Sequence, residues 1–106
     1  MKTLNDKVKA LLGFASKSGS LCYGFSDVTQ ALKKGKVNGV FFACDVSEKS
    51  RKEILFYSQK YGVKAYELKG IDMSALGGAV GRKCSVVGLN NDSFYDPLIS
   101  NLTSEF

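Results

Sequence analysis

Val40-Phe41-Phe42-Ala43-Cys44 is a compact apolar run between a glycine and an aspartate, and it decides the fold of this 106-residue sequence. The run is too short for a helix and rich in strand-forming residues, which is typical of a strand covered on both faces. Asp45-Val46-Ser47 then leaves the strand, and the next helix is capped either by Ser47 or by Ser50 and Glu53 at capping-box spacing. The stretch therefore predicts a central strand that leads directly into a helix.

Two helical patterns precede this strand. Apolar residues recur at helical spacing from Leu4 to Ala15, and Lys17-Ser18-Gly19 has the polar residue and the glycine that end a helix. A short strand is expected around residues 20–22. We expect Ser26 to cap a second helix that ends at Gly35. The inward-facing residues expected for this second helix are Val28, Ala31 and Leu32.

Helical and strand patterns also follow the central strand. The helix after Ser47 is expected to end at Gly62, and residues 63–68 alternate enough to form a strand. The expected inner face of the helix after Ser47 consists of Ile54, Leu55, Tyr57, Ser58 and Tyr61.

The last third of the chain continues this alternation. Either Asp72 or Ser74 is expected to cap a short helix, and residues 84–89 form the next apolar strand. Asp96 and Pro97 are typical of an N-cap and a first helical position, so we expect the last helix to begin there. The inward-facing residues expected for these two helices are Met73, Leu76 and Val80, and then Leu98, Ile99 and Leu102.

The alternation of helices and strands predicts an α/β fold. We expect a three-layer α/β/α sandwich with a mixed, roughly four-stranded sheet. Residues 1–106 fit a single small domain with its own core, because no linker, repeat or low-complexity segment interrupts them.

The charge is unevenly distributed. The formal net charge is +5, yet residues 90–106 contain no Lys or Arg. The basic residues form three groups, Lys33 with Lys34 and Lys36, Lys49 with Arg51 and Lys52, and Arg82 with Lys83. Such groups are often solvated helix faces, but three of them in one small domain are typical of a protein that binds nucleic acid.

Apolar runs and cysteines bear on the location of the protein. No apolar run approaches the roughly 20 residues that span a bilayer, and the N-terminus lacks a secretory pattern. Cys22, Cys44 and Cys84 are odd in number and have apolar neighbours, which indicates reduced, buried thiols. We therefore expect a cytoplasmic protein with no membrane contact.

The sequence gives little support to an enzyme. It contains no histidine and no Cys-x-x-Cys pair, which excludes Ser-His, Cys-His and His-metal sites. The glycines of residues 77–81 match neither a dinucleotide fingerprint nor a phosphate-binding loop. We therefore expect no catalytic residue, no metal and no cofactor.

Residues 24–33, Gly-Phe-Ser-Asp-Val-Thr-Gln-Ala-Leu-Lys, place a glycine turn directly before a helix start. A helix start presents unpaired N–H groups and the positive end of the helix dipole, and in a basic protein its natural ligand is a phosphate. The turn at Gly24, the strand exit at residues 45–47 and the loop at residues 77–83 are expected to meet at one edge of the sheet. The sequence therefore predicts an RNA or DNA surface made of three segments.

Several short motifs, in this order and spacing, resemble one known family. They are Leu11-Leu12-Gly13-Phe14-Ala15, residues 24–32, residues 40–47, Tyr61-Gly62-Val63, and Ala75-Leu76-Gly77 with Val80-Gly81. Together they resemble the ribosomal protein superfamily L7Ae/L30e over nearly the whole chain, with the closest likeness to its small bacterial branch, the YlxQ-type proteins. The resemblance implies an α/β/α sandwich that binds RNA, commonly kink-turns, without catalysing a reaction.

The resemblance also implies positions for RNA contacts. Kink-turn-binding members have Gly-x-Asn-Glu at the second helix start and a Lys three residues later, which read the guanines of sheared G·A pairs. Here Gly24 matches the glycine, whereas Ser26, Asp27 and Gln30 replace the Asn, Glu and Lys. These replacements shorten the acceptor arm and remove the amide donors and the charge that suit guanine, so we expect amide and phosphate contacts to matter most.

The expected function is non-catalytic, ribosome-associated binding of structured RNA, either kink-turn-like RNA or rRNA. The alternative is a protein-interaction or assembly module, in which Tyr23, Phe25 or Phe94 contacts a partner. Further expected partners are the ribosome or its proteins, and the free protein is expected to be a monomer. The candidate RNA-binding residues are Lys17, Gly24, Phe25, Ser26, Asp27, Gln30, Lys33, Ser47, Val80, Gly81, Arg82 and Lys83.

Overall fold

Helices and strands alternate along residues 4–103, the part of the chain that the computed structural model describes, with side chains described for residues 6–100. The order is α1 (Leu4–Lys17), β1 (Leu21–Tyr23), α2 (Phe25–Lys33), β2 (Gly39–Ala43), α3 (Glu48–Lys60), β3 (Ala65–Leu68), α4 (Met73–Val80), β4 (Val86–Leu89) and α5 (Asp92–Thr103).

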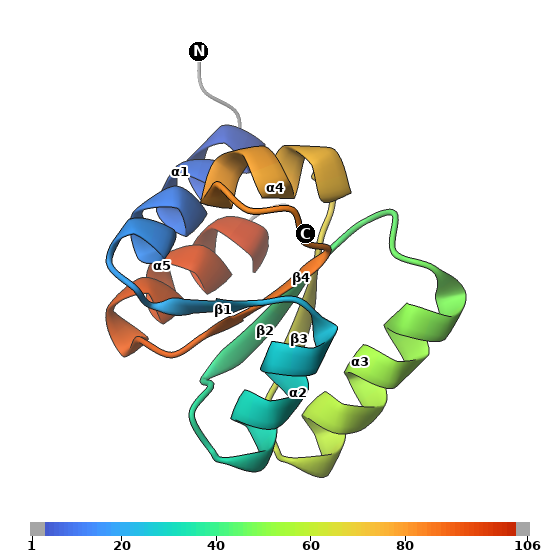
Figure 1. The fold of residues 1–106 in the computed structure, drawn as a ribbon. Coiled ribbons are helices and arrows are strands. Elements are labelled where there is room, and N and C mark those ends of the chain that lie inside the picture. The colour runs from blue at the N-terminus through green and yellow to red at the C-terminus, as the bar shows by residue number, and fades with distance from the viewer. Residues whose placement is uncertain (1–3, 104–106) are drawn as a thin grey trace.

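The four strands form one mixed sheet in the order β1-β4-β2-β3. β2 and β3 are parallel, whereas β4 is antiparallel to both β1 and β2. Helices α1, α4 and α5 cover one face of the sheet, and α2 and α3 cover the other (Figure 1). The predicted α/β/α sandwich with a mixed four-stranded sheet is confirmed.

The central strand β2 is buried on both faces. Phe41 and Ala43 belong to the core beneath α1, α4 and α5, whereas Val40 and Phe42 belong to the core beneath α2 and α3. All five residues of β2 are buried, because successive side chains of a strand point to opposite faces and both faces are covered here. The prediction from the apolar run at residues 40–44 is confirmed.

Two predicted helix starts are wrong. Gly24 occupies the N-cap of α2 and Ser26 lies inside the helix, without a side-chain cap. The last helix begins at Asp92 rather than at Asp96, and Pro97 lies inside it. The side-chain oxygen of Asn91 accepts a hydrogen bond from the N–H of Ser93 at 2.9 Å, so an earlier polar residue holds this helix start.

Some side chains do not face the core as expected. Leu55 is 44% exposed and Met73 is 38% exposed, although both were expected to face inward. Cys84 is buried, whereas Cys22 and Cys44 are only half-buried, and all three are free thiols. The prediction of buried thiols is therefore confirmed for Cys84 alone. The side chains of Leu4 and Leu102 lie outside the described residues.

Replacing Ser58 by alanine is expected to stabilise the protein. Ser58 is 2% exposed, and its Oγ has no hydrogen-bond partner among the described residues. Removing an unsatisfied buried hydroxyl relieves its desolvation penalty, and alanine favours the helix, so the free energy of unfolding should rise by about 1 kcal/mol. Urea denaturation of the Ser58→Ala variant measures this change. A loss of stability would show that the hydroxyl has a partner.

The titration of Tyr66 is expected to make stability fall at high pH. Burial raises the pKa of Tyr66 from 10.0 to about 12, and the hydrogen bond to the Tyr95 hydroxyl contributes. That bond is 3.0 Å long. The folded protein thus keeps this proton longer than the unfolded chain, and stability should decline as pH rises through this interval. The ultraviolet absorbance of tyrosinate measures the pKa, which Tyr95→Phe should lower. An unchanged titration in that variant would contradict the assignment.

Candidate nucleic-acid interface

One edge of the sheet brings together the three segments that the sequence singled out. β1 and β2 end at this edge and β4 begins there, because β4 is antiparallel to both. The N–H of Gly24 donates to the carbonyl of Val86 at 2.9 Å, and the N–H of Ala43 donates to that of Ser85 at 2.9 Å. The turn at Gly24, the strand exit at Asp45 and the loop before β4 are therefore neighbours.

The start of α2 has glycine at its N-cap, so the N-cap residue leaves the N–H groups of the first turn without a side-chain acceptor. Gly24 has φ 87° and ψ 158°, a conformation that is essentially restricted to glycine. It has no side chain that could accept hydrogen bonds from the first turn, and no side chain of the described residues caps the helix. The exposed residues Phe25, Ser26 and Asp27 form that first turn. Their N–H groups precede the first helical hydrogen bond, which Val28 donates to the Gly24 carbonyl.

At the starts of the neighbouring helices α3 and α4, side chains accept hydrogen bonds from first-turn N–H groups. Ser47 caps α3 by accepting a hydrogen bond from the N–H of Ser50. Asp72 caps α4 by accepting from Ala75, and the carboxylate of Asp45 accepts from the N–H of Met73 at 2.9 Å. Of the starts of α2, α3 and α4, that of α2 is the one at which no side chain of the described residues accepts a hydrogen bond from a first-turn N–H.

Arg82 is held beside the end of β1. Its guanidinium lies 4.8 Å from the centre of the Tyr23 ring, a cation–π contact. Ser16 Oγ donates to the carbonyl of Val80 at 2.7 Å, which leaves the Tyr23 hydroxyl to donate to Ser16 Oγ at 2.5 Å. These contacts join the ends of α1, β1 and α4, and they place a positive charge next to the residue that precedes Gly24.

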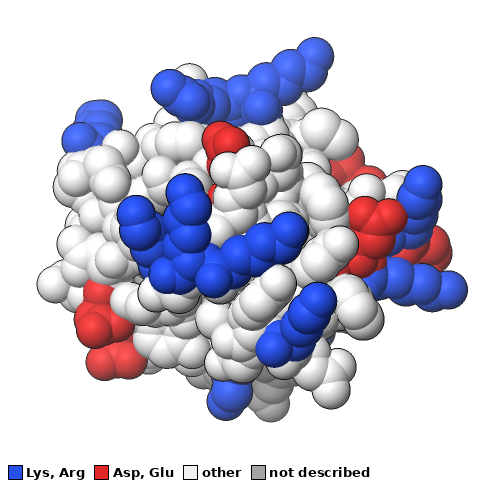
Figure 2. Space-filling view, turned by 60° about the horizontal axis from the view of Figure 1, so that its bottom comes forward, with Lys and Arg blue, Asp and Glu red and all other residues white. Residues whose placement is uncertain are grey.

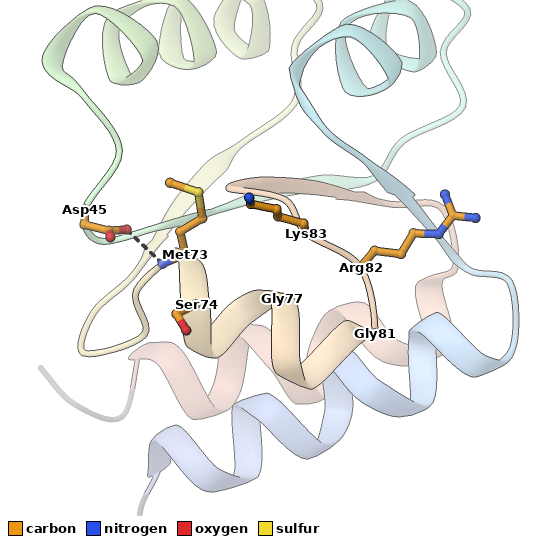
Figure 3. A pocket seen from close by; sticks show the side chains of 7 residues that line it. All are labelled: Asp45, Met73, Ser74, Gly77, Gly81, Arg82 and Lys83. Carbon is orange, nitrogen blue, oxygen red and sulfur yellow. Dashed lines mark hydrogen bonds between the residues drawn. The ribbon is translucent and has the colours of Figure 1, made fainter.

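A groove of about 610 Å³ lies beside this edge (Figure 3). Lys83 extends across it toward Met73, whereas Arg82 points away from it, toward β1. Gly81 has φ 78° and ends α4 in a left-handed conformation, which directs the chain back over the groove. The lining residues are Asp45, Met73, Ser74, Gly77, Gly81, Arg82 and Lys83.

The structure groups some predicted site residues and separates others. Arg82 contacts Tyr23, the residue before Gly24, and Gln30 is exposed on α2 three positions after Asp27, on the same side of the helix. Phe25 is 36% exposed and contacts the Tyr57 ring edge to face. Ser47, which is the N-cap of α3, lies at the same edge of the sheet. These residues, with Gly24, Gly81 and Lys83, form the candidate interface.

Three predicted site residues lie elsewhere. The Val80 side chain is 6% exposed and packs in the core, so it is unavailable to a ligand. Lys33 ends the nine-residue helix α2, which places it about 13 Å from the helix start. Lys17 ends α1, before the turn that leads into β1, so the length of β1 separates it from Gly24. The helical pattern had also predicted that Val80 faces inward, and its burial confirms that expectation rather than the expected RNA contact.

The basic groups do not form one surface. The group of Lys33, Lys34 and Lys36 follows the end of α2, at the bottom of Figure 1, and that end faces forward in Figure 2. Figure 2 shows Lys and Arg side chains in separate groups, with neutral and acidic side chains between them. Arg51 is ion-paired with Glu48 and Glu67. The basic side chains at the candidate interface are thus Arg82 and Lys83.

The sequence did not predict which residues position Arg82 or which residues line the groove. Tyr23 and Ser16 were not expected to position Arg82, and Met73 and Ser74 were not expected to line a groove. No local pattern links these residues, since the contacts join segments that are far apart in the chain. Among the described residues, no group of three potential metal ligands is present. Nor does any described helix have the length and apolar character of a membrane span.

Comparisons with known proteins identify a matching family model and similar solved structures. A model of the ribosomal protein L7Ae/L30e/S12e/Gadd45 family matches residues 6–96. A Bacillus halodurans protein of unknown function superimposes with a TM-score of 0.85 at 24% identity, over 92% of this chain and 97% of its own. The Giardia lamblia 15.5kD RNA binding protein superimposes with a TM-score of 0.76 at 16% identity, over 95% of this chain and 86% of its own. No curated protein sequence matches.

Proposed function

Because the family match spans residues 6–96, the chain belongs to the ribosomal protein L7Ae/L30e/S12e/Gadd45 family, and we propose that it is a non-catalytic RNA-binding protein. In this proposal residues 1–106 act as one domain, in the cytoplasm and in association with the ribosome. The RNA is structured, either rRNA or a kink-turn-like element. Within the family, the YlxQ-type branch is the proposed nearest relative.

The open start of α2 beside Arg82 and Lys83 is the observation that supports this proposal best. The helix presents three N–H groups and its positive dipole end. Two exposed cations, Arg82 and Lys83, precede β4, whose first residue Val86 accepts a hydrogen bond from the Gly24 N–H. This arrangement suits a phosphate group that is already fixed in a sharply bent backbone, since the donors come from two rigid segments.

The shape of the site favours irregular RNA over a regular duplex. The major groove of an A-form helix is too narrow for side chains, so proteins recognise splayed nucleotides and distorted backbones instead. The groove of about 610 Å³ beside Lys83 offers space for an unstacked nucleotide next to the phosphate site. We propose that the helix start holds the backbone while the groove accepts such a nucleotide.

Base reading is the smaller part of the proposed interaction. Ser26 offers one hydroxyl, Asp27 a short acceptor arm and Gln30 an uncharged amide, so none of them is an Arg or Lys that pairs bidentately with guanine. Contacts from the backbone and to phosphates position RNA without reading its sequence. The protein should therefore select RNA shape more strongly than sequence.

The aromatic residues give less support to the alternative of a protein-interaction module. Tyr23 is engaged by Ser16 and Arg82, and Phe25 packs against Tyr57. Both rings already have partners within the chain. A protein partner at this edge would therefore find part of each ring already covered.

A salt titration tests the proposal. Fluorescence anisotropy would measure binding to a labelled kink-turn RNA and to a regular hairpin of equal length. We expect saturable binding that prefers the kink-turn, with a log–log salt slope of about −2 for the two phosphates that Arg82 and Lys83 neutralise. A lack of saturable binding at about 50 mM salt, where phosphate contacts are strong, would refute RNA binding.

A further inference from the structure

β3 is the outermost strand on one side of the sheet, because it pairs only with β2 among the described strands. It is called the β3 edge below, to separate it from the strand ends at which the candidate RNA interface lies. The carbonyl of Lys64 accepts a hydrogen bond from the N–H of Val40, and Tyr66 lies opposite Phe41 in the parallel register. Backbone groups of successive strand residues point to alternate sides, so the N–H and C=O groups of Ala65 and Glu67 point away from β2. The edge thus presents unpaired donors and acceptors, a template for another strand.

A groove of about 580 Å³ runs along this edge, between α3 and β3. Leu55, on α3, is 44% exposed and lines it, although the neighbouring α3 side chain Ile54 is buried in the core. The lining residues are Leu55, Ser58, Gln59, Gly62, Val63, Lys64, Ala65 and Tyr66. The surface therefore combines apolar side chains with open backbone hydrogen-bonding groups.

The charge around this groove is positive. The charged residues in the segment 55–67, which contains the groove lining, are Lys60, Lys64 and Glu67. One of these, Glu67, is already ion-paired with Arg51. Lys64 lies in the groove lining itself. An acidic ligand would therefore be attracted to this edge.

We propose that the groove between α3 and β3 docks an extended acidic segment of a partner protein, which adds as a strand beside β3. Backbone hydrogen bonds to Ala65 and Glu67 would supply affinity, and Leu55 would receive an apolar side chain of the segment. Alternating acidic and apolar residues fit this surface best, because alternate side chains of a strand face opposite sides.

Two other occupants fit less well. A second copy pairing β3 with β3 would bring the lysines at positions 64 and 69 of both copies together, and like charges across strands are destabilising. RNA would satisfy the lysines but would leave the apolar lining and the strand edge unmatched. The groove lies toward the start of β3 and the end of α3, whereas the proposed RNA site lies beyond the end of β2, so both sites can be occupied together.

An NMR titration tests the proposal. The probe is an N-acetylated decapeptide in which Glu alternates with Val, and the control peptide has Lys in place of Glu. We expect the acidic peptide to shift the amide signals of Ala65 and Glu67 in a saturable manner and to slow their hydrogen exchange, and the control peptide to bind at least about tenfold more weakly. Kink-turn RNA should leave both signals unchanged, whether or not it binds elsewhere on the protein.

Matched variants locate the binding. Leu55→Ser should weaken the peptide about fivefold or more by removing apolar contact area. Phe56→Ser, which changes a 59% exposed residue outside the groove lining, should leave binding unchanged. Ala65→Pro should abolish binding because it removes an outward N–H, which an edge strand tolerates.

Three results would each overturn the proposal. They are no saturable shift with the acidic peptide, equal losses in the Leu55 and Phe56 variants, and RNA-induced shifts at Ala65 and Glu67. Shifts at β3 that depend on protein concentration without peptide would assign the edge to a second copy instead.

Discussion

Replacing both Arg82 and Lys83 by glutamate is expected to lower RNA affinity about hundredfold or more at low salt. Both side chains are exposed in the loop that precedes β4, and the first residue of β4 accepts a hydrogen bond from the Gly24 N–H just before α2. Charge reversal removes two attractions to phosphate and adds two repulsions next to the helix N–H groups. The log–log salt slope should become shallower by about two, one for each lost phosphate contact.

A variant with the same charge change provides the control. Lys33→Glu with Lys34→Glu alters two exposed lysines at the other end of α2. Because this end is about 13 Å from the helix start, screening by salt should limit its effect to about threefold. Fluorescence anisotropy would compare both variants, with circular dichroism to check folding. Equal losses would mean that RNA binds through general charge, not at the sheet edge.

Replacing Gly24 by alanine is expected to destabilise the fold and weaken RNA binding together. Gly24 has φ 87°, and an added Cβ would meet no atom within 4 Å. Strain rather than crowding is therefore the cost, about 1–3 kcal/mol in the free energy of unfolding. Relief of that strain would turn the first peptide groups of α2, so RNA affinity should fall about tenfold, as expected for one or two lost charge-assisted hydrogen bonds.

Gly78→Ala is the matched control for this substitution. Gly78 lies within α4, has no positive φ, and also has open space around an added Cβ. Alanine favours a helix interior, so this variant should gain about 0.5–1 kcal/mol and bind RNA unchanged. Urea denaturation and anisotropy would measure both. If Gly24→Ala were as stable as the native protein, the conformation assigned to Gly24 would be wrong.

The architecture was predictable because burial leaves a clear pattern in this chain. The apolar run at residues 40–44 required cover on both faces, and helical spacing on either side supplied the two layers. The meeting of three segments at one sheet edge also followed from the alternation. Helix starts were less predictable, since several polar residues compete to cap one helix. Gly24 is the cap of α2 because its positive φ turns the chain there, a requirement that Ser26 does not meet.

For the candidate site, the sequence predicted which backbone segments meet but not how the side chains are held. Gly24, Asp27 and Gly81 were placed correctly at one edge by chain order and strand direction. The support of Arg82 by Tyr23 depends on packing between distant segments, for which a single sequence gives no pattern. The distance of Lys33 from the site follows from helix length, and it shows that proximity in sequence does not make a lysine part of a surface.

The most direct test is an NMR titration of the labelled protein with a kink-turn RNA. If the start of α2 holds the RNA backbone, the amides of Phe25, Ser26 and Asp27 should show large shifts and slowed hydrogen exchange. The amides of Ser50 and Ala75, which already donate to the caps of α3 and α4, should change little. Saturable RNA binding with no change at residues 25–27 would rule out the proposed site, because the open start of α2 would then have no part in the interaction.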